Sequence, residues 1–370
     1  MKGGVVSNSL LAPTHAFNPS APPRDKRPLR APAPVYHPFS AGDGTDLRLV
    51  RYRAGSRGPV ILAHGMASSS WMWAIDTIET NLVEFLAARD YDVWLLDWRA
   101  SIALPSAASA YTLDDVATHD WPAAVAEVRR ETGAADVQVV NHCIGSLTFH
   151  MAMLAGLEGV RSAVGLQVGT HIVAPPLGQL KAHLYLPTFI KVLGTKSMTA
   201  YVDANENWFH KIYDEALKLY PVQGEEVCDS PVCRRICFEY GMLYEHDQLS
   251  QATHANLHEL FGVTGMRIFE HLALLGRREH VVDAHGHEAY MPHLERLAIP
   301  LLLISGEENT CILPVSTERT IEALGERNGR ELYARRVIPK YGHVDCSFGK
   351  DAATDVYPAI LEHLEATRRP

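Results

Sequence analysis

Short apolar runs recur along the chain, and segments with helical spacing separate them. Four of these runs, each about five to ten residues long, occupy 59–65, 91–98, 136–140 and 160–169, and another lies at 299–306. Runs that are apolar at nearly every position predict strands buried on both faces, as in a parallel sheet covered by helices. Two strands at 35–40 and 47–54, joined by a turn at Gly-Asp-Gly, precede them, and 331–339 predicts a last strand before a C-terminal helix.

The segments between the strands predict helices. In 112–133, Thr112 is a suitable N-cap and Gly133 follows the expected end. We expect further helices from Gly65 to about Arg89 and over 147–157. Strict alternation of strand and helix predicts a mostly parallel sheet with helices on both faces.

The alternation stops between 170 and 297, where the chain has helical spacing with loops and many His and aromatic residues. We therefore predict an α/β core over 35–169 and 298–370 with an inserted helical lid over 170–297. Residues 1–34 are rich in proline, which disfavours helix and strand. They predict an extended arm or, equally, a disordered tail.

The strongest chemical motif follows the third apolar run, at Asn141-His142-Cys143-Ile144-Gly145-Ser146. A nucleophile on a sharp strand-to-helix turn needs small residues two positions before and after it. Gly145 fits the second position, and Asn141 departs from the first, although Asn tolerates unusual φ better than most residues. Cys143 is the expected nucleophile. Two alternatives have less support. Cys143 could be only a small buried residue, or Ser146 could be the nucleophile.

This motif resembles the Gly-His-Ser-Met-Gly-Gly elbow of the α/β-hydrolase superfamily, with Cys in place of Ser. The resemblance implies the α/β-hydrolase fold over most of the chain. The motif is also similar to the hydrolase-like region associated with cholesterol-oxidase-type oxidoreductases. More distantly, it resembles polyhydroxyalkanoate synthases and dienelactone hydrolases, superfamily members that use a Cys nucleophile.

The superfamily order of nucleophile, acid and histidine assigns the other catalytic residues. His343 follows the last predicted strand and is the expected base. The acid position aligns best with Asn309, and a neutral Asn can suffice to orient the ring of a Cys–His pair. Glu308, and with less support Glu307, could supply a carboxylate instead. We interpret Asp345 as a loop-capping carboxylate.

The loops after the first apolar run and after the nucleophile supply the oxyanion donors of this fold. We expect the backbone N–H groups of Met66 and Ile144 to form the oxyanion hole. The expected substrate contacts are His64, Gly65, His142 and Trp98. Asp97-Trp98-Arg99 is interpreted as mainly structural, holding loops near the site.

The composition of the chain limits the classes of partner that it can bind. A net charge of −9 and a pI of about 6.1 argue against nucleic acid or an anionic membrane. We find no apolar run of the roughly 18 residues that a spanning helix needs, and the N-terminus is a poor secretory signal. Six cysteines in 370 residues favour reduced thiols in the cytoplasm.

Three of those cysteines, Cys228, Cys233 and Cys237, lie in the predicted lid. Their spacing matches no metal motif that we know, so buried thiols are favoured over a metal site, although His246 could serve as a fourth ligand. No organic cofactor is implied, because neither a dinucleotide-binding nor a phosphate-binding glycine motif is present.

These features together predict an acyl-transfer enzyme: a thioesterase, an esterase, or an acyltransferase or condensing enzyme. It would form an acyl-thioester on Cys143 from an apolar ester or thioester, which is a small molecule or carrier-bound. The alternative is a degenerate hydrolase-fold protein that only binds a lipid or steroid-like ligand. A homodimer, with the arm packed on a neighbouring subunit, is a further arrangement that the arm would allow.

Overall fold

The computed structural model describes residues 24–183, 197–200, 215, 217 and 228–369. An eight-stranded sheet forms its centre, in the order β1-β2-β4-β3-β5-β6-β9-β10. β2 pairs antiparallel with β1 and with β4, and the remaining neighbours are parallel. The strands are β1 Val35–Ser40, β2 Asp46–Arg53, β3 Arg57–Ala63, β4 Tyr91–Asp97, β5 Val137–His142, β6 Val160–Leu166, β9 Leu301–Gly306 and β10 Tyr333–Ile338.

All eight predicted strands are present, and the sheet is covered on both faces, as predicted. Alternate residues of the same strand enter different cores: Val60 and Leu62 pack into one, Ile61 and Ala63 into the other. This double burial explains why the strand sequences are apolar at nearly every position. The helices of the core are α1 Leu82–Ala87, α2 Leu113–Asp115, α3 Trp121–Thr132, α4 Ile144–Leu154, α11 Val315–Asn328, α12 Asp345–Phe348, α13 Ala352–Asp355 and α14 Tyr357–Ala366.

The helical segment after Thr112 confirms its predicted ends. Thr112 caps α2 through a capping box with Asp115, and Gly133 ends α3 with a φ of 70°. The expected helix from Gly65 to Arg89 is wrong over most of its length. Only α1 is an α-helix there, because Asn81 and Glu84 form a capping box that sets its start.

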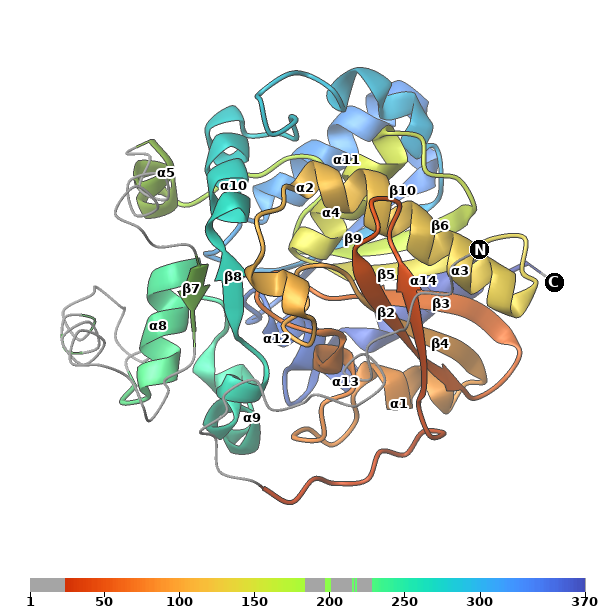
Figure 1. Ribbon diagram of the computed structural model, residues 1–370, viewed down its shortest axis with the longest axis horizontal. Coiled ribbons are helices and arrows are strands. Elements are labelled where there is room, and N and C mark those ends of the chain that lie inside the picture. Colours follow the sequence, from red (N-terminus) through yellow and green to blue (C-terminus); the bar gives the residue numbers. More distant parts are fainter. Residues whose placement is uncertain (1–23, 184–196, 201–214, 216, 218–227, 370) are drawn as a thin grey trace.

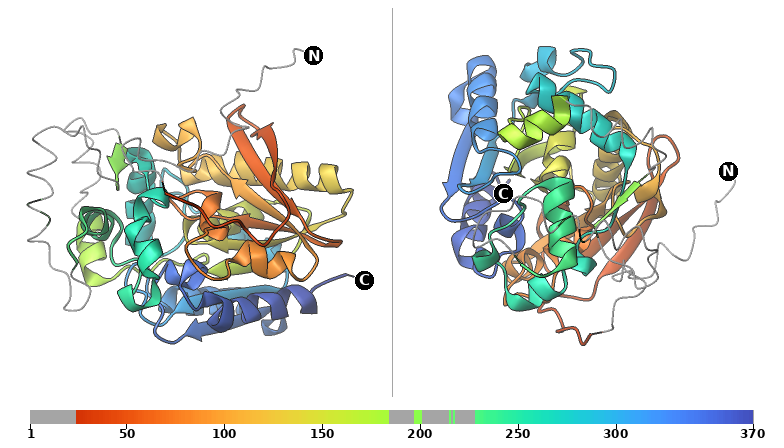
Figure 2. Two further views of the ribbon diagram at one scale, coloured as in Figure 1. Left: turned by 90° about the horizontal axis from the view of Figure 1, so that it is seen from below. Right: turned by 90° about the vertical axis from the view of Figure 1, so that its left-hand side faces the viewer.

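The described helices and strands between β6 and β9, up to Arg278, lie together on one side of the molecule, beside the sheet (Figure 1, Figure 2). It is not purely helical, because β7 and β8 form a separate antiparallel two-stranded sheet. We refer to the described residues of 170–297 as the lid. Its elements are α5 Pro176–His183, β7 Ser197–Thr199, α8 Pro231–Tyr240, α9 Gln251–Ala255, β8 Val263–Gly265 and α10 Met266–Arg278.

The described part of the N-terminal arm runs along the core as an extended chain fixed by arginines. Arg24 binds both Asp76 and Glu259, with nitrogen–oxygen distances of 2.7–3.1 Å. Arg27 forms a two-point ion pair with Glu84, a buried carboxylate. Residues 24–34 therefore fit the extended-arm prediction, whereas most of the predicted arm, 1–23, lies outside the described residues.

Among the described helices, none combines the length and apolar character that a membrane span requires.

Candidate active site

Cys143 occupies a strained turn between β5 and α4. Its φ of 53° and ψ of −123° lie in a region that non-glycine residues rarely adopt. Such strain is typical of a nucleophile raised above the carboxyl edge of a parallel sheet. Asn141 lies within β5 and has no positive φ. The unusual φ that we expected Asn141 to tolerate belongs to Cys143 instead.

Gly145 is required by a close approach of two loops. A Cβ atom on Gly145 would lie 2.3 Å from the carbonyl oxygen of His64, which follows β3. This contact brings the β3 loop against the start of α4. The loop and the nucleophile turn are thereby held as one unit.

The backbone N–H groups of Ile144 and Met66 both donate toward the sulfur of Cys143. They come from the first residue of α4 and from the loop after β3. These are the two donors expected from the sequence. Two N–H groups converging beside a nucleophile can stabilise the negative oxygen that develops when a carbonyl is attacked.

His343 lies in the loop after β10, fully buried, and its Nδ1 lies 3.3 Å from Oδ1 of Asn309. Asn309 Oδ1 also accepts the N–H groups of Cys311 and Ile312. The Asn309 amide oxygen therefore faces the ring, and Nδ1 must carry the proton. Nε2 of His343 has no hydrogen-bond partner among the described residues, which leaves it able to accept a proton.

Gln167 holds this pair in place and was missed in the sequence. Its side-chain oxygen accepts from Asn309 Nδ2 at 2.9 Å, and its side-chain nitrogen donates to the carbonyl of His343 at 2.7 Å. Gln167 has a φ of 79° just after β6. A glutamine at the end of an apolar strand, at the edge where the other motifs meet, was the available signal.

The candidate base and the candidate nucleophile lie close together. A ring nitrogen of His343, one of His142 and the Cys143 sulfur lie within 4.8 Å of one another. His142 donates from Nε2 to the His343 carbonyl at 3.1 Å. A nucleophile–base contact that is longer than a hydrogen bond in a ligand-free site can tighten when substrate binds.

The competing candidates differ in their surroundings. The Ser146 hydroxyl donates to the carbonyl of Val168 at 2.6 Å inside the core. Glu307 and Glu308 are exposed, and Glu308 lines the cavity that contains Cys143, whereas Asn309 is buried with its Oδ1 facing the His343 ring. Asp345 accepts N–H groups of Gly342 and Glu245, which fits a loop-capping role.

Burial sets the protonation of the catalytic pair. It raises the pKa of the Cys143 thiol to about 12, against the opposing effect of the Ile144 and Met66 N–H groups. Burial, and then the neighbouring His142, lower the pKa of His343 well below its usual value. Both shifts favour a neutral thiol beside a neutral imidazole in the resting site.

A cavity of about 730 Å³ opens at Cys143 and His343. Its wall is mainly apolar and combines core loops with the lid; prominent lining residues are Met66, Met72, Phe238, Tyr240, Met242, Phe261, Phe269, Leu272 and Cys311. Gly65 and His142 line it as expected. The expected substrate contacts of His64 and Trp98 are wrong, because neither residue is part of the described cavity lining. The centroids of their stacked rings lie 5.1 Å apart within the core, and the Trp98 indole N–H donates to the His64 carbonyl.

Comparisons with known proteins agree with this architecture. A family model described as "alpha/beta hydrolase fold" matches residues 58–181. The solved structure "Lipase (Open form)" superposes with a TM-score of 0.59 at 14% identity, covering 90% of this chain and 99% of that one. The chain has an α/β-hydrolase fold. Cys143 follows β5, His343 follows β10 and Asn309 follows β9, so all three candidate residues lie just beyond the carboxyl ends of parallel strands.

Other proteins are similar to this chain in fold or in sequence. The structure of Rv0554 from Mycobacterium tuberculosis gives a TM-score of 0.57 at 15% identity over 91% of this chain and all of that one. Among curated proteins, Lipase member K of Homo sapiens is 22% identical over 85% of this chain and 81% of its own. Lipase 3 of Drosophila melanogaster is 24% identical over 85% of this chain and 83% of its own. The chain is thus similar in sequence to several lipases, at 22–24% identity for these two.

Replacement of Asn309 tests which residue orients the base. Asn309→Ala should lower kcat by roughly 10²-fold with little change in KM, because the imidazole loses the acceptor for Nδ1–H. Asn309→Asp should lose less, since it keeps an acceptor but places a carboxylate oxygen against Gln167 Oε1. Steady-state kinetics of both variants, with Glu308→Gln as the matched control, measure this. A larger loss in Glu308→Gln than in Asn309→Ala would assign the role to Glu308.

Proposed function

We propose that this α/β-hydrolase transfers acyl groups through a covalent intermediate on Cys143, acting on apolar esters or thioesters. The observation that carries the proposal is the convergence at the elbow. The Cys143 sulfur receives two backbone N–H groups and lies within 4.8 Å of a His343 ring nitrogen. A buried structural cysteine would need neither arrangement.

The neutral resting pair suggests how the proton moves. As the Cys143 sulfur attacks the carbonyl carbon, Nε2 of His343 takes the thiol proton, and the N–H groups of Met66 and Ile144 bind the developing oxyanion. The carbon–oxygen or carbon–sulfur bond to the leaving group then breaks, and His343 returns the proton to that group. An acceptor, either water or another nucleophile, releases the acyl group from Cys143 by the same steps in reverse.

The cavity supports an apolar acyl or polycyclic group as substrate. Its volume of about 730 Å³ lies in the range of small-molecule sites, and its mainly apolar wall includes several Met and aromatic side chains. Lipases among the relatives also favour ester chemistry on lipid-like molecules. Carrier-bound thioesters suit the same site, because a thiolate leaving group matches a sulfur nucleophile.

The test is a panel of acyl esters and acyl-thioesters of increasing chain length, incubated with the purified full chain and analysed for released acid. An added alcohol or thiol acceptor separates hydrolysis from transfer. We expect turnover that rises with apolar acyl length until the cavity is filled. Binding of sterols or fatty acids without turnover of any acyl donor would instead support the degenerate, ligand-binding alternative.

The pKa shifts predict an unusual pH profile. His343 must be neutral to take the thiol proton, and its pKa is lowered, so it stays neutral as pH falls below 6.5. The Cys143 thiol, with a pKa of about 12, stays protonated up to high pH. We therefore expect kcat/KM to be flat between about pH 7 and 9, with an acid limb centred below about 6.5.

The profile is measured with an uncharged ester, so that the substrate itself does not titrate. The rate of Cys143 alkylation by iodoacetamide should rise continuously up to pH 9. A plateau in that rate between pH 5 and 8 would reveal a thiolate–imidazolium pair and contradict the neutral pair.

A further inference from the structure

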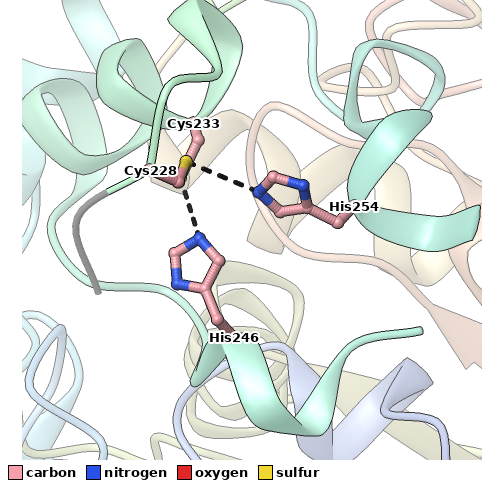
Figure 3. Close-up of side chains that lie close together, drawn as sticks. All are labelled: Cys228, Cys233, His246 and His254. Atoms are coloured by element: carbon pink, nitrogen blue, oxygen red, sulfur yellow. Dashed lines mark hydrogen bonds between the residues drawn. The ribbon is translucent and has the colours of Figure 1, made fainter. Parts of the chain in front are cut away.

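A second cluster of chemically active side chains lies in the lid. The side-chain ligand atoms of Cys228, Cys233, His246 and His254 all lie within 4.8 Å of one another (Figure 3). Cys228 precedes α8, Cys233 lies within it, and His254 lies on α9. The described lining of the catalytic cavity includes none of the four.

We propose that these four residues form a zinc site that fixes the lid. Two thiolates and two imidazoles are a ligand set that zinc takes in tetrahedral structural sites. The proposal departs from the sequence interpretation, which favoured buried thiols without a metal. The sequence pattern grouped Cys237 with Cys228 and Cys233. In the structure His254, and not Cys237, lies beside these two cysteines and His246.

The distances fit one ion at the centre. Zinc–sulfur bonds of about 2.3 Å and zinc–nitrogen bonds of about 2.0 Å at a tetrahedral angle place sulfur and nitrogen roughly 3.5 Å apart. The Cys228 sulfur lies 3.6 Å from His254 Nε2, and the Cys233 sulfur lies 3.5 Å from His246 Nε2. Two separate thiol–imidazole hydrogen bonds would explain each distance, but not why the two pairs converge on one point.

The surroundings also suit thiolate ligands. The Tyr244 hydroxyl donates to the Cys233 sulfur at 3.0 Å, and the backbone N–H of Ser230 donates toward the Cys228 sulfur. Hydrogen bonds of this kind orient and stabilise metal-bound sulfur. Cys233 is buried, while the other three ligands are half-buried, so an ion can enter from solvent.

The site would act on the cavity indirectly. The chain between Cys233 and His246 carries part of the cavity wall, including Phe238, Tyr240 and Met242. An ion bound at both ends of this segment would hold that wall in position. The inference does not depend on the proposed acyl chemistry, because metal binding is measured without substrate.

The experiment measures metal in the purified full chain, with any affinity tag removed and no chelator present. Elemental analysis after gel filtration should give about one zinc per chain. Cys228→Ser and His254→Ala should each reduce this to below about 0.2. Cys237→Ser and His258→Ala, a neighbouring lid cysteine and histidine, should keep the metal. Cys143→Ala should also keep it, which excludes binding at the catalytic His142–Cys143–His343 group.

A spectroscopic readout keeps the test decisive if the ligand variants do not fold. Wild-type protein loaded with Co²⁺ in place of zinc should show the intense visible bands of tetrahedral cobalt and a thiolate charge-transfer band. Folded wild type that contains less than about 0.1 zinc per chain and takes up neither zinc nor Co²⁺ overturns the proposal. Undiminished zinc in folded Cys228→Ser and His254→Ala variants also overturns it.

Discussion

Cys143→Ala should lower kcat/KM toward apolar esters by roughly 10³- to 10⁵-fold, the largest loss that we expect from a single substitution. The variant removes the sulfur that we assign to the covalent intermediate while keeping the backbone N–H groups beside it. A small residual rate can remain, since the oxyanion donors still polarise a bound carbonyl. Steady-state kinetics with the best substrate of the panel provide the measurement.

The control for this variant is Cys311→Ala. Cys311 lines the same cavity, and its sulfur donates to the carbonyl of Tyr240. Losing this thiol changes the shape of the wall but no reacting atom, so we expect less than about a tenfold change. Similar losses in the two variants would mean that Cys143 contributes only packing.

His343→Ala should have the second-largest effect, a loss of roughly 10³-fold or more in kcat with KM nearly unchanged. The variant loses Nε2, the proton acceptor that we assign to a thiol whose pKa is raised to about 12 by burial. Raising the pH should partly rescue this variant, because more of the Cys143 thiol then ionises unaided. The pH dependence of kcat, wild type against variant, measures this.

The matched control is His150→Gln. His150 is equally buried, on α4, and its Nδ1 is bonded to the Ser146 carbonyl, away from the reacting sulfur. We expect its loss to lower the melting temperature and to change kcat much less than the loss of His343 does. If kcat of His343→Ala stayed within a few-fold of wild type at neutral pH, His343 would not be the base.

Much of the fold could be predicted because its strands are buried on both faces. Residues such as Ile61 and Leu62 must both be apolar, since they enter different cores. The region after β3 could not be predicted as well. Its helical spacing suggested a long helix, but the capping box of Asn81 and Glu84 starts α1 late. Local hydrogen bonds of this kind compete with periodicity and are weak sequence signals.

In the candidate site, too, some residues could be predicted from the sequence and others could not. Cys143, His343 and Asn309 follow the ends of strands, and parallel topology brings those ends together, so their positions could be inferred. Gln167 and His254 could not, because their roles come from contacts between segments distant in sequence. His64 and Trp98 were expected in the cavity because they flank its loops, but their rings pack inward. The likeness to the cholesterol-oxidase-associated region, the cytoplasmic location and the homodimer stay predictions.

The most direct test of the central claim is intact-protein mass spectrometry after rapid mixing with an acyl-thioester, followed by peptide mapping. We predict one added acyl group on wild type, located on Cys143 and removed by hydroxylamine, and none on Cys143→Ala. Cys143→Ser should retain the group longer if it is acylated at all, because an ester resists the next nucleophile better than a thioester. Turnover of acyl donors by wild type with no acyl adduct at any time point, or with the same adduct in Cys143→Ala, would contradict a covalent mechanism through Cys143.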